Sequence, residues 1–375
     1  MSFLAIKGID NLPIDVSTED ALRILNVLAE VNAKLGKLES EFKHAIVSQP
    51  LIQMLSLSES VESTKIEGTQ VTFADMVEEK DNRERRWEII EVENYQFALH
   101  EGFARVREGY PISTRLIREL HQLLMEGARG STTSSGQFRK IQNYIGPTNR
   151  IEDATYIPPP AHEIDDYMAN LEKFINGDTN NRKNVTKDRF AIHEGSDPLI
   201  KTAVMHAQFE SIHPFLDGNG RLGRILIVLS LAKDWVISQP VFFVSEELEK
   251  EKHRYYDLLN GVRGQHPDWG AWILFFLEAS NRMADQLLNK LAQSEQLAKD
   301  GLDLCETASE RHVWLYTFTD PSTTAKKAAN ATGVSTNTAR KALNALASRR
   351  QIYADQQKMR NVKYRNYDLL RILRD

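Results

Sequence analysis

The apolar run from Leu222 to Leu231 constrains most strongly how this 375-residue chain folds. Such a run predicts a buried helix, and two glycines just before it, Gly218 and Gly220, place the start of that helix at about Gly220 or Arg221. A buried helix needs other elements around it, so we expect the rest of the chain to serve this segment. The apolar positions are Leu222, Ile225, Leu226, Ile227, Val228, Leu229 and Leu231.

The twelve residues from His213 to Arg224 read His-Pro-Phe-Leu-Asp-Gly-Asn-Gly-Arg-Leu-Gly-Arg. Without side chains at Gly218 and Gly220, backbone N–H groups can approach a ligand at the positive end of a helix dipole, which favours an anion. Arg221 and Arg224, three residues apart, share a face of the first helical turn and can reach different oxygens of one phosphate chain. The segment therefore predicts a site for a polyphosphate.

Two further side chains complete the predicted chemistry of this segment. The Asp217 carboxylate has the wrong sign for a phosphate, unless a hard cation such as Mg²⁺ bridges it to the phosphate oxygens. The imidazole of His213, with an ordinary pKa near 6.5, can accept a proton from an attacking hydroxyl. The pattern indicates phosphate chemistry with a proton acceptor beside it.

Two other interpretations of the same residues are weaker. Gly218 to Gly223 fits Gly-x-Gly-x-x-Gly, but the preceding run from Leu199 to Ile212 looks helical, and the nearest downstream acid is Asp234, so a dinucleotide fingerprint is rejected. His206, Glu210 and His213 have a helical spacing that could hold a metal for hydrolysis. This alternative gives the glycines and arginines no role.

The segment resembles the signature of the Fic family, His-Pro-Phe-x-(Asp or Glu)-Gly-Asn-Gly-Arg-x-x-Arg, at every specified position. Fic proteins mostly transfer AMP from ATP to a Ser, Thr or Tyr hydroxyl of a target protein. The resemblance implies that His213 is the base, that Asp217 holds Mg²⁺, and that ATP is the donor. The phosphates would be held by Gly218, Asn219, Gly220, Arg221 and Arg224.

The resemblance also gives weight to Ser63–Gly68. Many Fic proteins carry an inhibitory helix marked (Ser or Thr)-x-x-x-Glu-(Gly or Asn), and Ser63, Glu67 and Gly68 fit this pattern on a helix predicted from Pro50 to Gly68. A Glu67 carboxylate paired with Arg224 would occupy the space and the charge that the ATP γ-phosphate needs. The sequence alone supports a solvated helix end equally.

Three more sets of residues follow from the resemblance. Runs 142–145 and 154–157 around a turn-rich loop predict a β-hairpin, and in Fic proteins such a hairpin is a flap that pairs with the target backbone. The flap candidates are Thr155, Tyr156 and Ile157. Gln208 is expected to touch the nucleotide or to pack in the core, and Tyr255 and Tyr256 to flank an adenine or to be core.

The charge distribution separates a basic C-terminal part from an acidic body. Residues 321–375 contain 12 Lys and Arg against 3 Asp and Glu, a net charge of +9 in a chain whose total is −5. Cys305, the single cysteine, excludes an internal disulfide framework, and the chain has no span of membrane length. With no signal-like N-terminal segment, a cytoplasmic location is expected.

The C-terminal residues resemble a winged helix domain. Helices are predicted over 310–318, 324–332 and 336–348, followed by a two-stranded wing over 352–367. The predicted outward-facing residues are Asn337, Arg340, Lys341 and Asn344 on the third helix and Lys358, Arg360, Lys363 and Arg365 in the wing. This basic pattern is typical of DNA binding, although winged helices also dock proteins, and both partners stay open.

The sequence thus predicts a mainly α protein: an N-terminal helical region (1–112) with an inhibitory helix at about 50–68, a Fic-type helical core with a β-hairpin flap (113–280), a helical linker (281–305) and a winged helix domain (306–375). The expected activity is that of a magnesium- and ATP-dependent protein adenylyltransferase restrained by Glu67. Its partner would be a target protein or the chain itself, no membrane is expected, and a homodimer stays open. The alternatives are removal of AMP, transfer of another phosphorylated group, and a DNA-binding regulator whose core senses nucleotide.

Overall fold

The computed structural model describes residues 5–78, 86–128, 134–148, 150–177, 185–355 and 361–374. The chain divides into two compact units. Unit 1 holds Met1–Leu35, Glu62–Gln70 and Arg86–Ala284, and unit 2 holds Gly36–Val61, Val71–Arg85 and Asp285–Asp375. Two of the predicted wing cations, Lys358 and Arg360, lie outside the described residues, as does Asn149 in the loop of the predicted hairpin. The domain boundaries given above stay predictions.

The described part of the chain is mainly helical, as predicted. Helix α1 begins at Thr18, because the Ser17 hydroxyl accepts the Asp20 N–H at 3.0 Å and caps the first turn. The helices are α1 (Thr18–His44), α2 (Ser48–Ile66), α3 (Phe73–Glu78), α4 (Trp87–Arg107), α5 (Thr114–Leu124), α6 (Ile164–Asn176), α7 (Pro198–Ile212), α8 (Asn219–Lys233), α9 (Ser245–Lys250), α10 (Lys252–Gly261), α11 (Trp269–Asp303), α12 (Ala308–Tyr316), α13 (Ala325–Thr332), α14 (Thr336–Ser348) and α15 (Tyr367–Arg374).

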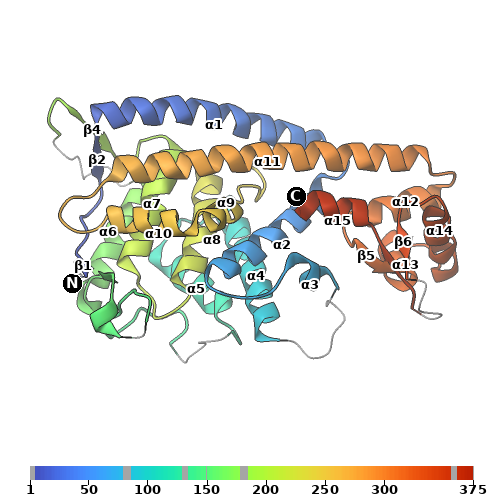
Figure 1. The fold of residues 1–375 in the computed structure, drawn as a ribbon, viewed down its shortest axis with the longest axis horizontal. Coiled ribbons are helices and arrows are strands. Elements are labelled where there is room, and N and C mark those ends of the chain that lie inside the picture. Colours follow the sequence, from blue (N-terminus) through green and yellow to red (C-terminus); the bar gives the residue numbers. More distant parts are fainter. Residues whose placement is uncertain are drawn as a thin grey trace. The chain divides into compact units, whose positions relative to one another are not determined.

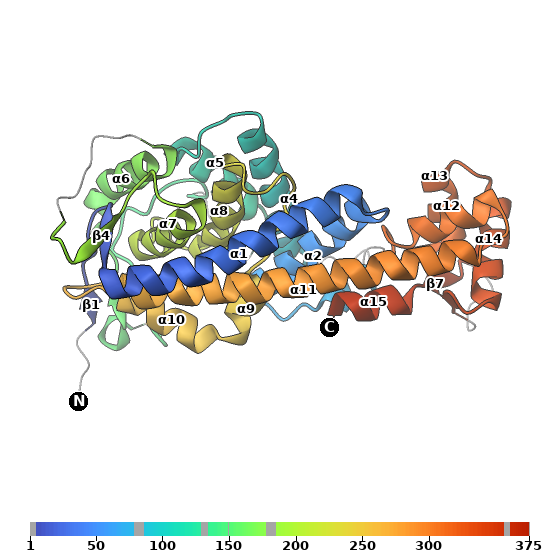
Figure 2. The same cartoon turned by 90° about the horizontal axis from the view of Figure 1, so that it is seen from above.

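Helix α8 is the centre of unit 1. Its residues from Arg221 to Ala232 are buried, which confirms the buried helix predicted from the apolar run. Helix α7 packs along it, and α4 and α5 contact it as well (Figures 1 and 2). A helix that is apolar around its whole circumference needs neighbours on several faces, and these three helices supply them.

The strands of unit 1 differ from the predicted hairpin. Strand β3 (Tyr156–Ile157) pairs in parallel with β1 (Ile6–Lys7), and the run at 142–145 meets β3 only through a single antiparallel bridge between Ile145 and Tyr156. A second sheet joins β2 (Ile14–Ser17) and β4 (Arg189–Ile192) antiparallel. The hairpin prediction missed β1 because its partner lies far away in the chain.

The C-terminal part of unit 2 contains the three predicted helices, α12, α13 and α14. The left-handed backbone of Gly333, at φ 72°, ends α13 as expected. The wing strands β6 (Tyr353–Ala354) and β7 (Lys363–Arg365) are joined by β5 (Ser322–Thr324), which the sequence reading missed, in the order β5-β7-β6. The element order agrees with the expected one, and the winged helix assignment stays a prediction.

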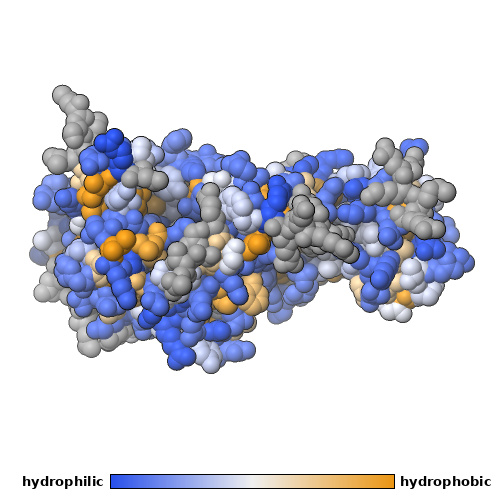
Figure 3. All heavy atoms as spheres, turned by 90° about the horizontal axis from the view of Figure 1, so that it is seen from below, coloured by the Kyte–Doolittle hydropathy of each residue, from blue (hydrophilic) through white to orange (hydrophobic). Residues whose placement is uncertain are grey.

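No helix among the described residues is long and apolar enough to span a membrane. The face drawn in Figure 3 is mostly hydrophilic, and its hydrophobic areas are small and separate. Helix α11 runs without a break from Trp269 to Asp303, so the apolar run after Trp269 and the predicted helical linker belong to one helix.

Candidate active site

His213 lies at the C-terminal end of α7. The Asp197 carboxylate caps the start of this helix by accepting the Leu199 N–H at 2.8 Å, and Pro198 occupies the first turn. At the other end His213 has a left-handed backbone, with φ 49°, and its N–H donates to the Phe209 carbonyl at 3.0 Å. This conformation is uncommon outside glycine and stops the helix at the imidazole.

The turn after His213 is closed by its own side chains. Asn219 accepts the Phe215 N–H and donates to the Phe215 carbonyl, each at 2.9 Å, and Asp217 accepts the Gly218 N–H at 2.6 Å. Gly218 has φ 79°, and a Cβ there would lie 2.8 Å from the Met125 sulfur. The side chain of Asn219 is thus committed to the turn, which leaves its backbone N–H, with those of Gly220 and Arg221, at the open end of α8.

Arg224 is buried, with 1% of its surface exposed, and the end of α2 surrounds it. Its Nε donates to the Ser63 hydroxyl at 2.7 Å, and its Nη2 donates to the Ser63 carbonyl at 2.8 Å and to Glu67 Oε1 at 2.7 Å. A Cβ on Gly220 would collide with the same Glu67 oxygen, so a side chain at this position would push the carboxylate aside. The expected pairing of Glu67 with Arg224 is present in this structure.

The charges in the ion pair support each other. Burial on its own would raise the pKa of Glu67, but the Arg224 guanidinium outweighs it and holds that pKa below its usual range. In turn, Glu67 raises the pKa of Arg224 against the effect of burial. Gly68, with φ 96°, ends the helix just after the pair. The inhibitory role of these residues stays a prediction.

Three histidines around α7 and α8 are neutral near pH 7, of which His121 and His206 are buried and His213 is half-buried. Burial lowers the pKa of His213 to about 4, and the nearby Arg263 and Arg139 add to this effect. Burial also lowers the pKa of His206 to about 3 and that of His121 to about 4. Neutral imidazole is the form that accepts a proton, so His213 is in the protonation state that a general base needs.

Glu210 and His206 do not form the metal site that their spacing allowed. One ring nitrogen of His206 lies 3.2 Å from the Gly223 carbonyl and the other lies 2.9 Å from the Tyr255 hydroxyl. Burial raises the pKa of Glu210 to about 7. Among the described residues there is no group of three or more His, Cys, Asp and Glu side chains placed to hold a metal ion.

The comparisons with known proteins agree with this geometry. Residues 111–231 match the model of the Fic/DOC family, and residues 25–104 match the model described as Fic/DOC family N-terminal. Together the two matches cover more than half of the chain. This chain belongs to the Fic/DOC family. A crystal structure of a Fic family protein from Desulfovibrio desulfuricans G20 is similar over 92% of this chain and 95% of its own, with a TM-score of 0.55 and 21% identity, which shows the shared fold.

Two curated relatives match a smaller part of the chain. The chain is 25% identical over 177 residues to the protein adenylyltransferase Fic of Aedes aegypti, which covers 47% of this chain and 29% of that protein. It is 30% identical over 133 residues to a uridine 5'-monophosphate transferase of Xanthomonas campestris, covering 35% of this chain and 22% of the relative. The chain therefore spans less than a third of the length of these two relatives.

Within this Fic/DOC site the structure separates the predicted nucleotide contacts. Gln208 is buried and its side chain donates to the Asp10 carbonyl at 2.8 Å, so the core alternative describes it. Tyr255 is also buried, with its hydroxyl on His206. Tyr256 is 36% exposed, and burial of its hydroxyl, together with the negative charge of Glu67, raises its pKa.

The flap prediction needs a correction at Tyr156. Its side chain is fully buried and its hydroxyl donates to the Ser211 carbonyl at 2.6 Å. Its backbone is paired with Ile6 on one side and with Ile145 on the other. Both edges are therefore occupied, and β3 has no free edge at Tyr156 for the backbone of a target. Thr155 donates to the same Ile145 carbonyl, and Ile157 pairs with Lys7.

The sequence reading missed several side chains that hold the Fic/DOC signature in place. Arg139 is buried and donates to the His213 carbonyl at 2.9 Å and to the Ile141 carbonyl at 3.1 Å. His121 stacks on Phe215 at 3.7 Å between ring centroids, and its Nε2 lies 2.9 Å from the Asp217 carbonyl. Glu91 lies 3.4 Å from Arg221. These residues belong to no local motif. The only signal in the sequence is that a charged residue stands among apolar neighbours.

The fit of the predicted Mg²⁺ depends on Asp217. Its side chain is 54% exposed, one oxygen accepts the Gly218 N–H, and that same oxygen lies 3.4 Å from Arg221. One reachable carboxylate beside a polyphosphate site is the donor set that Mg²⁺ commonly uses, since this ion retains waters and phosphate oxygens as its other ligands. Asp217 is thus compatible with the predicted role.

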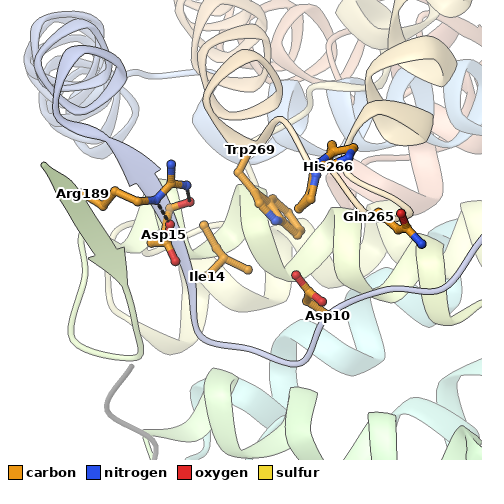
Figure 4. A pocket seen from close by; sticks show the side chains of 8 residues that line it. Asp10, Ile14, Asp15, Arg189, Gln265, His266 and Trp269 are labelled. Atoms are coloured by element: carbon orange, nitrogen blue, oxygen red, sulfur yellow. Dashed lines mark hydrogen bonds and ion pairs between the residues drawn. The ribbon is translucent and has the colours of Figure 1, made fainter. Parts of the chain in front are cut away.

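One cavity of unit 1, of about 390 Å³, contains none of the predicted site residues. Figure 4 shows its lining, in which Asp15 and Arg189 form an ion pair across β2 and β4. The segment beside it is fixed to the core, because the Gly264 N–H donates to the Gly8 carbonyl at 2.9 Å. The lining residues are Asp10, Ile14, Asp15, Arg189, Gln265, His266, Pro267 and Trp269.

The predicted DNA contacts fall into two groups. Asn337, Arg340, Lys341 and Asn344 are exposed on α14, as expected for a surface that meets a partner. In the wing, by contrast, Lys363 donates to the Glu78 carbonyl and Arg365 pairs with the Glu78 carboxylate, each at 3.1 Å. These two cations of β7 therefore already contact Glu78, which also belongs to unit 2.

Proposed function

We propose that this protein is an adenylyltransferase that moves AMP from ATP to a hydroxyl of a protein and that its own Glu67 restrains it. The observation that carries the proposal is Arg224, a buried cation at the start of α8 whose acceptors are Ser63, in the last turn of α2, and Glu67, just after that helix. A negatively charged side chain sits where an anionic ligand of that cation would sit. The relatives named protein adenylyltransferase Fic support the choice of AMP.

The proposed chemistry assigns each group a task. The N–H groups at the start of α8 and the guanidiniums of Arg221 and Arg224 bind the phosphates of ATP. Asp217 would hold Mg²⁺, which supplies positive charge to the phosphate oxygens. His213, neutral near pH 7, accepts the proton of the target hydroxyl as its oxygen attacks the α-phosphorus and pyrophosphate leaves.

Inhibition by Glu67 works through Arg224, a cation that the phosphates of ATP also need. While Glu67 pairs with Arg224, the outer phosphates of ATP lose that guanidinium, and the α-phosphate is not aligned for attack. Replacing Glu67 with glycine removes the competing carboxylate and keeps the rest of the site.

The test compares the wild type with Glu67→Gly, His213→Ala and the double variant, each incubated with Mg²⁺ and labelled ATP. We expect strong self-modification only in Glu67→Gly, and its loss in the double variant, because that variant lacks the proton acceptor. Intact mass spectrometry identifies the transferred group. If Glu67→Gly carried no more label than the wild type, the inhibitory role would be wrong.

A second candidate is transfer of UMP, favoured by the similarity to the uridine 5'-monophosphate transferase of Xanthomonas campestris. The groups described here bind phosphates and a hydroxyl and leave the base unspecified. Offering ATP, UTP, GTP and CTP to Glu67→Gly therefore separates the candidates by the mass that is added. Loss of mass from a protein that already carries AMP would instead indicate removal of the group.

The non-enzymatic alternative is a DNA-binding regulator, favoured by the exposed Arg340 and Lys341 on α14. Phosphate contacts release counterions, so DNA affinity must fall as salt is raised. A gel-shift series over salt concentration tests this directly. An affinity that does not change with salt would favour a protein partner for this surface.

A further inference from the structure

The guanidinium of Arg221 has partners different from those of Arg224. It is buried, with 3% of its surface exposed, and its Nη1 lies 3.4 Å from Glu91 Oε1, while its Nη2 lies 3.4 Å from Asp217 Oδ1. Its Nε and Nη1 have no hydrogen-bond acceptor among the described residues. A buried cation with unused donors has room for further acceptors, and a phosphate chain at the start of α8 would supply them.

Glu91 compensates this buried cation. It lies on α4 and is itself 3% exposed, so it and Arg221 face each other where water does not screen their charges. Asp217, in contrast, is half exposed at the other edge of the same guanidinium. The two carboxylates therefore hold the guanidinium between a buried side, at α4, and an open side, at the turn.

Thr69 fixes the second oxygen of Glu91. Its buried hydroxyl donates to Glu91 Oε2 at 2.7 Å. The backbone N–H of Thr69 donates to the Thr64 carbonyl at 3.2 Å, which ties it to the last turn of α2. Thr69 follows Glu67 by two residues, so the segment that supplies a carboxylate to Arg224 also supplies a hydroxyl to the partner of Arg221.

We infer that Glu91 is a positioning residue that holds Arg221 toward the outer phosphates of ATP, and that Thr69 orients Glu91. This inference rests on the proposed function, because it assigns Arg221 to a triphosphate. Glu91 touches no substrate in this arrangement. It acts through the guanidinium, whose position it sets by charge and by one fixed carboxylate oxygen.

The test measures binding of ATP and of AMP by calorimetry in the Glu67→Gly variant, which lacks the carboxylate that competes for Arg224. Glu91→Gln keeps the shape of the side chain and removes its charge. We expect the loss of this ion pair to weaken ATP binding about tenfold and to leave AMP binding unchanged. Glu88→Gln is the matched control, since Glu88 lies on the same helix and has no ion-pair or hydrogen-bond partner among the described residues.

Thr69 gives a second, independent readout. Thr69→Val should weaken ATP binding less than Glu91→Gln does, and Thr69→Ser, which keeps the hydroxyl, should restore the parent affinity. In the double variant Thr69→Val with Glu91→Gln, the loss should equal that of Glu91→Gln alone, because Thr69 acts only through Glu91.

The outcomes separate this inference from the proposed function. If the Glu67→Gly parent does not bind ATP, the proposed function fails. If the parent binds ATP and Glu91→Gln binds it equally well, only the role of Glu91 is overturned. Equal losses for ATP and AMP, accompanied by a lower melting temperature, would show that Glu91 serves only the fold and would overturn its positioning role.

Discussion

Helices α8 and α14 each carry two cations near their start, and the two pairs have different surroundings. On α8, Arg221 and Arg224 are buried, and their partners are specific side chains and a carbonyl of neighbouring helices and turns. On α14, Arg340 and Lys341 are exposed. A buried cation is fixed in position and costs free energy when its partner is lost, whereas an exposed one is screened by water and contributes little to stability. Burial, and not residue type, distinguishes a built site from a charged surface.

Truncating a cation in each place tests this contrast most strongly. Arg224→Ala should lower the free energy of unfolding by about 3 kcal/mol, because it leaves Glu67 and Ser63 without their partner and opens a cavity beside α2. Urea unfolding, followed by fluorescence, measures the change. Arg340→Ala serves as the control, and equal losses for the two variants would contradict the contrast.

Acid should destabilise the buried site through its histidines. The folded pKa is about 4 for His121, about 3 for His206 and about 4 for His213, below the ordinary value of a histidine. As pH falls below 6.5, these three side chains therefore bind protons in the unfolded chain but not in the folded one. Glu210, whose folded pKa is raised to about 7, has the opposite effect. The unfolded chain thus binds about two more protons than the folded chain, about three on the histidines less about one on Glu210. This difference predicts that the free energy of unfolding falls by about 3 kcal/mol per pH unit between pH 6 and 4.5.

Urea midpoints recorded across this pH range check the acid prediction. The sign follows from the three histidines outnumbering the single glutamate, so stability must decrease toward acid. Arg340→Ala should show the same pH dependence as the wild type. A midpoint that stays constant from pH 6.5 to 5 would mean that these histidines are solvated and titrate normally.

Removing one acceptor of Arg224 gives a smaller effect. Ser63→Ala deletes the hydroxyl that receives Arg224 Nε, while the Ser63 carbonyl and Glu67 still accept from Nη2, so we expect a loss of about 2 kcal/mol. Self-modification with ATP should rise, but less than in Glu67→Gly. Ser60→Ala, a buried serine of the same helix that donates to the Ser56 carbonyl, is the matched control for transfer. If Ser63→Ala and Ser60→Ala modified themselves to the same extent, Ser63 would have no part in the inhibition.

The exposed pair should give the smallest change in stability. The double variant Arg340→Ala with Lys341→Ala should keep its free energy of unfolding within about 0.5 kcal/mol of the wild type. If α14 binds DNA, the same variant should lower the slope of log affinity against log salt by about two, one for each lost phosphate contact. An unchanged slope would place the DNA contacts elsewhere.

The parts that sequence predicts well are local. The apolar run, the capping residues Ser17 and Asp197, and the left-handed Gly68 and Gly333 fix where helices begin and end, because each acts within a few residues of its own position. The signature places its own residues for the same reason. Even the pairing of Glu67 with Arg224 was predictable, since the resemblance supplied a long-range partner that spacing alone does not give.

The parts that sequence does not predict depend on distant segments. The pairing of β1 with β3 joins two-residue strands far apart in the chain, and strands this short show no alternation. Glu91 and Arg139 likewise lie on elements away from the signature and look like ordinary surface charges until the fold buries them. Tyr156 was misread because its strand was assumed to have a free edge.

Ser63 lies in the last turn of α2 and Glu67 directly follows that helix, four residues later, and both accept hydrogen bonds from Arg224. A rotation of the end of α2 about its axis would therefore move both acceptors away from the guanidinium together. We therefore expect the release of Arg224 to be all-or-none and not graded.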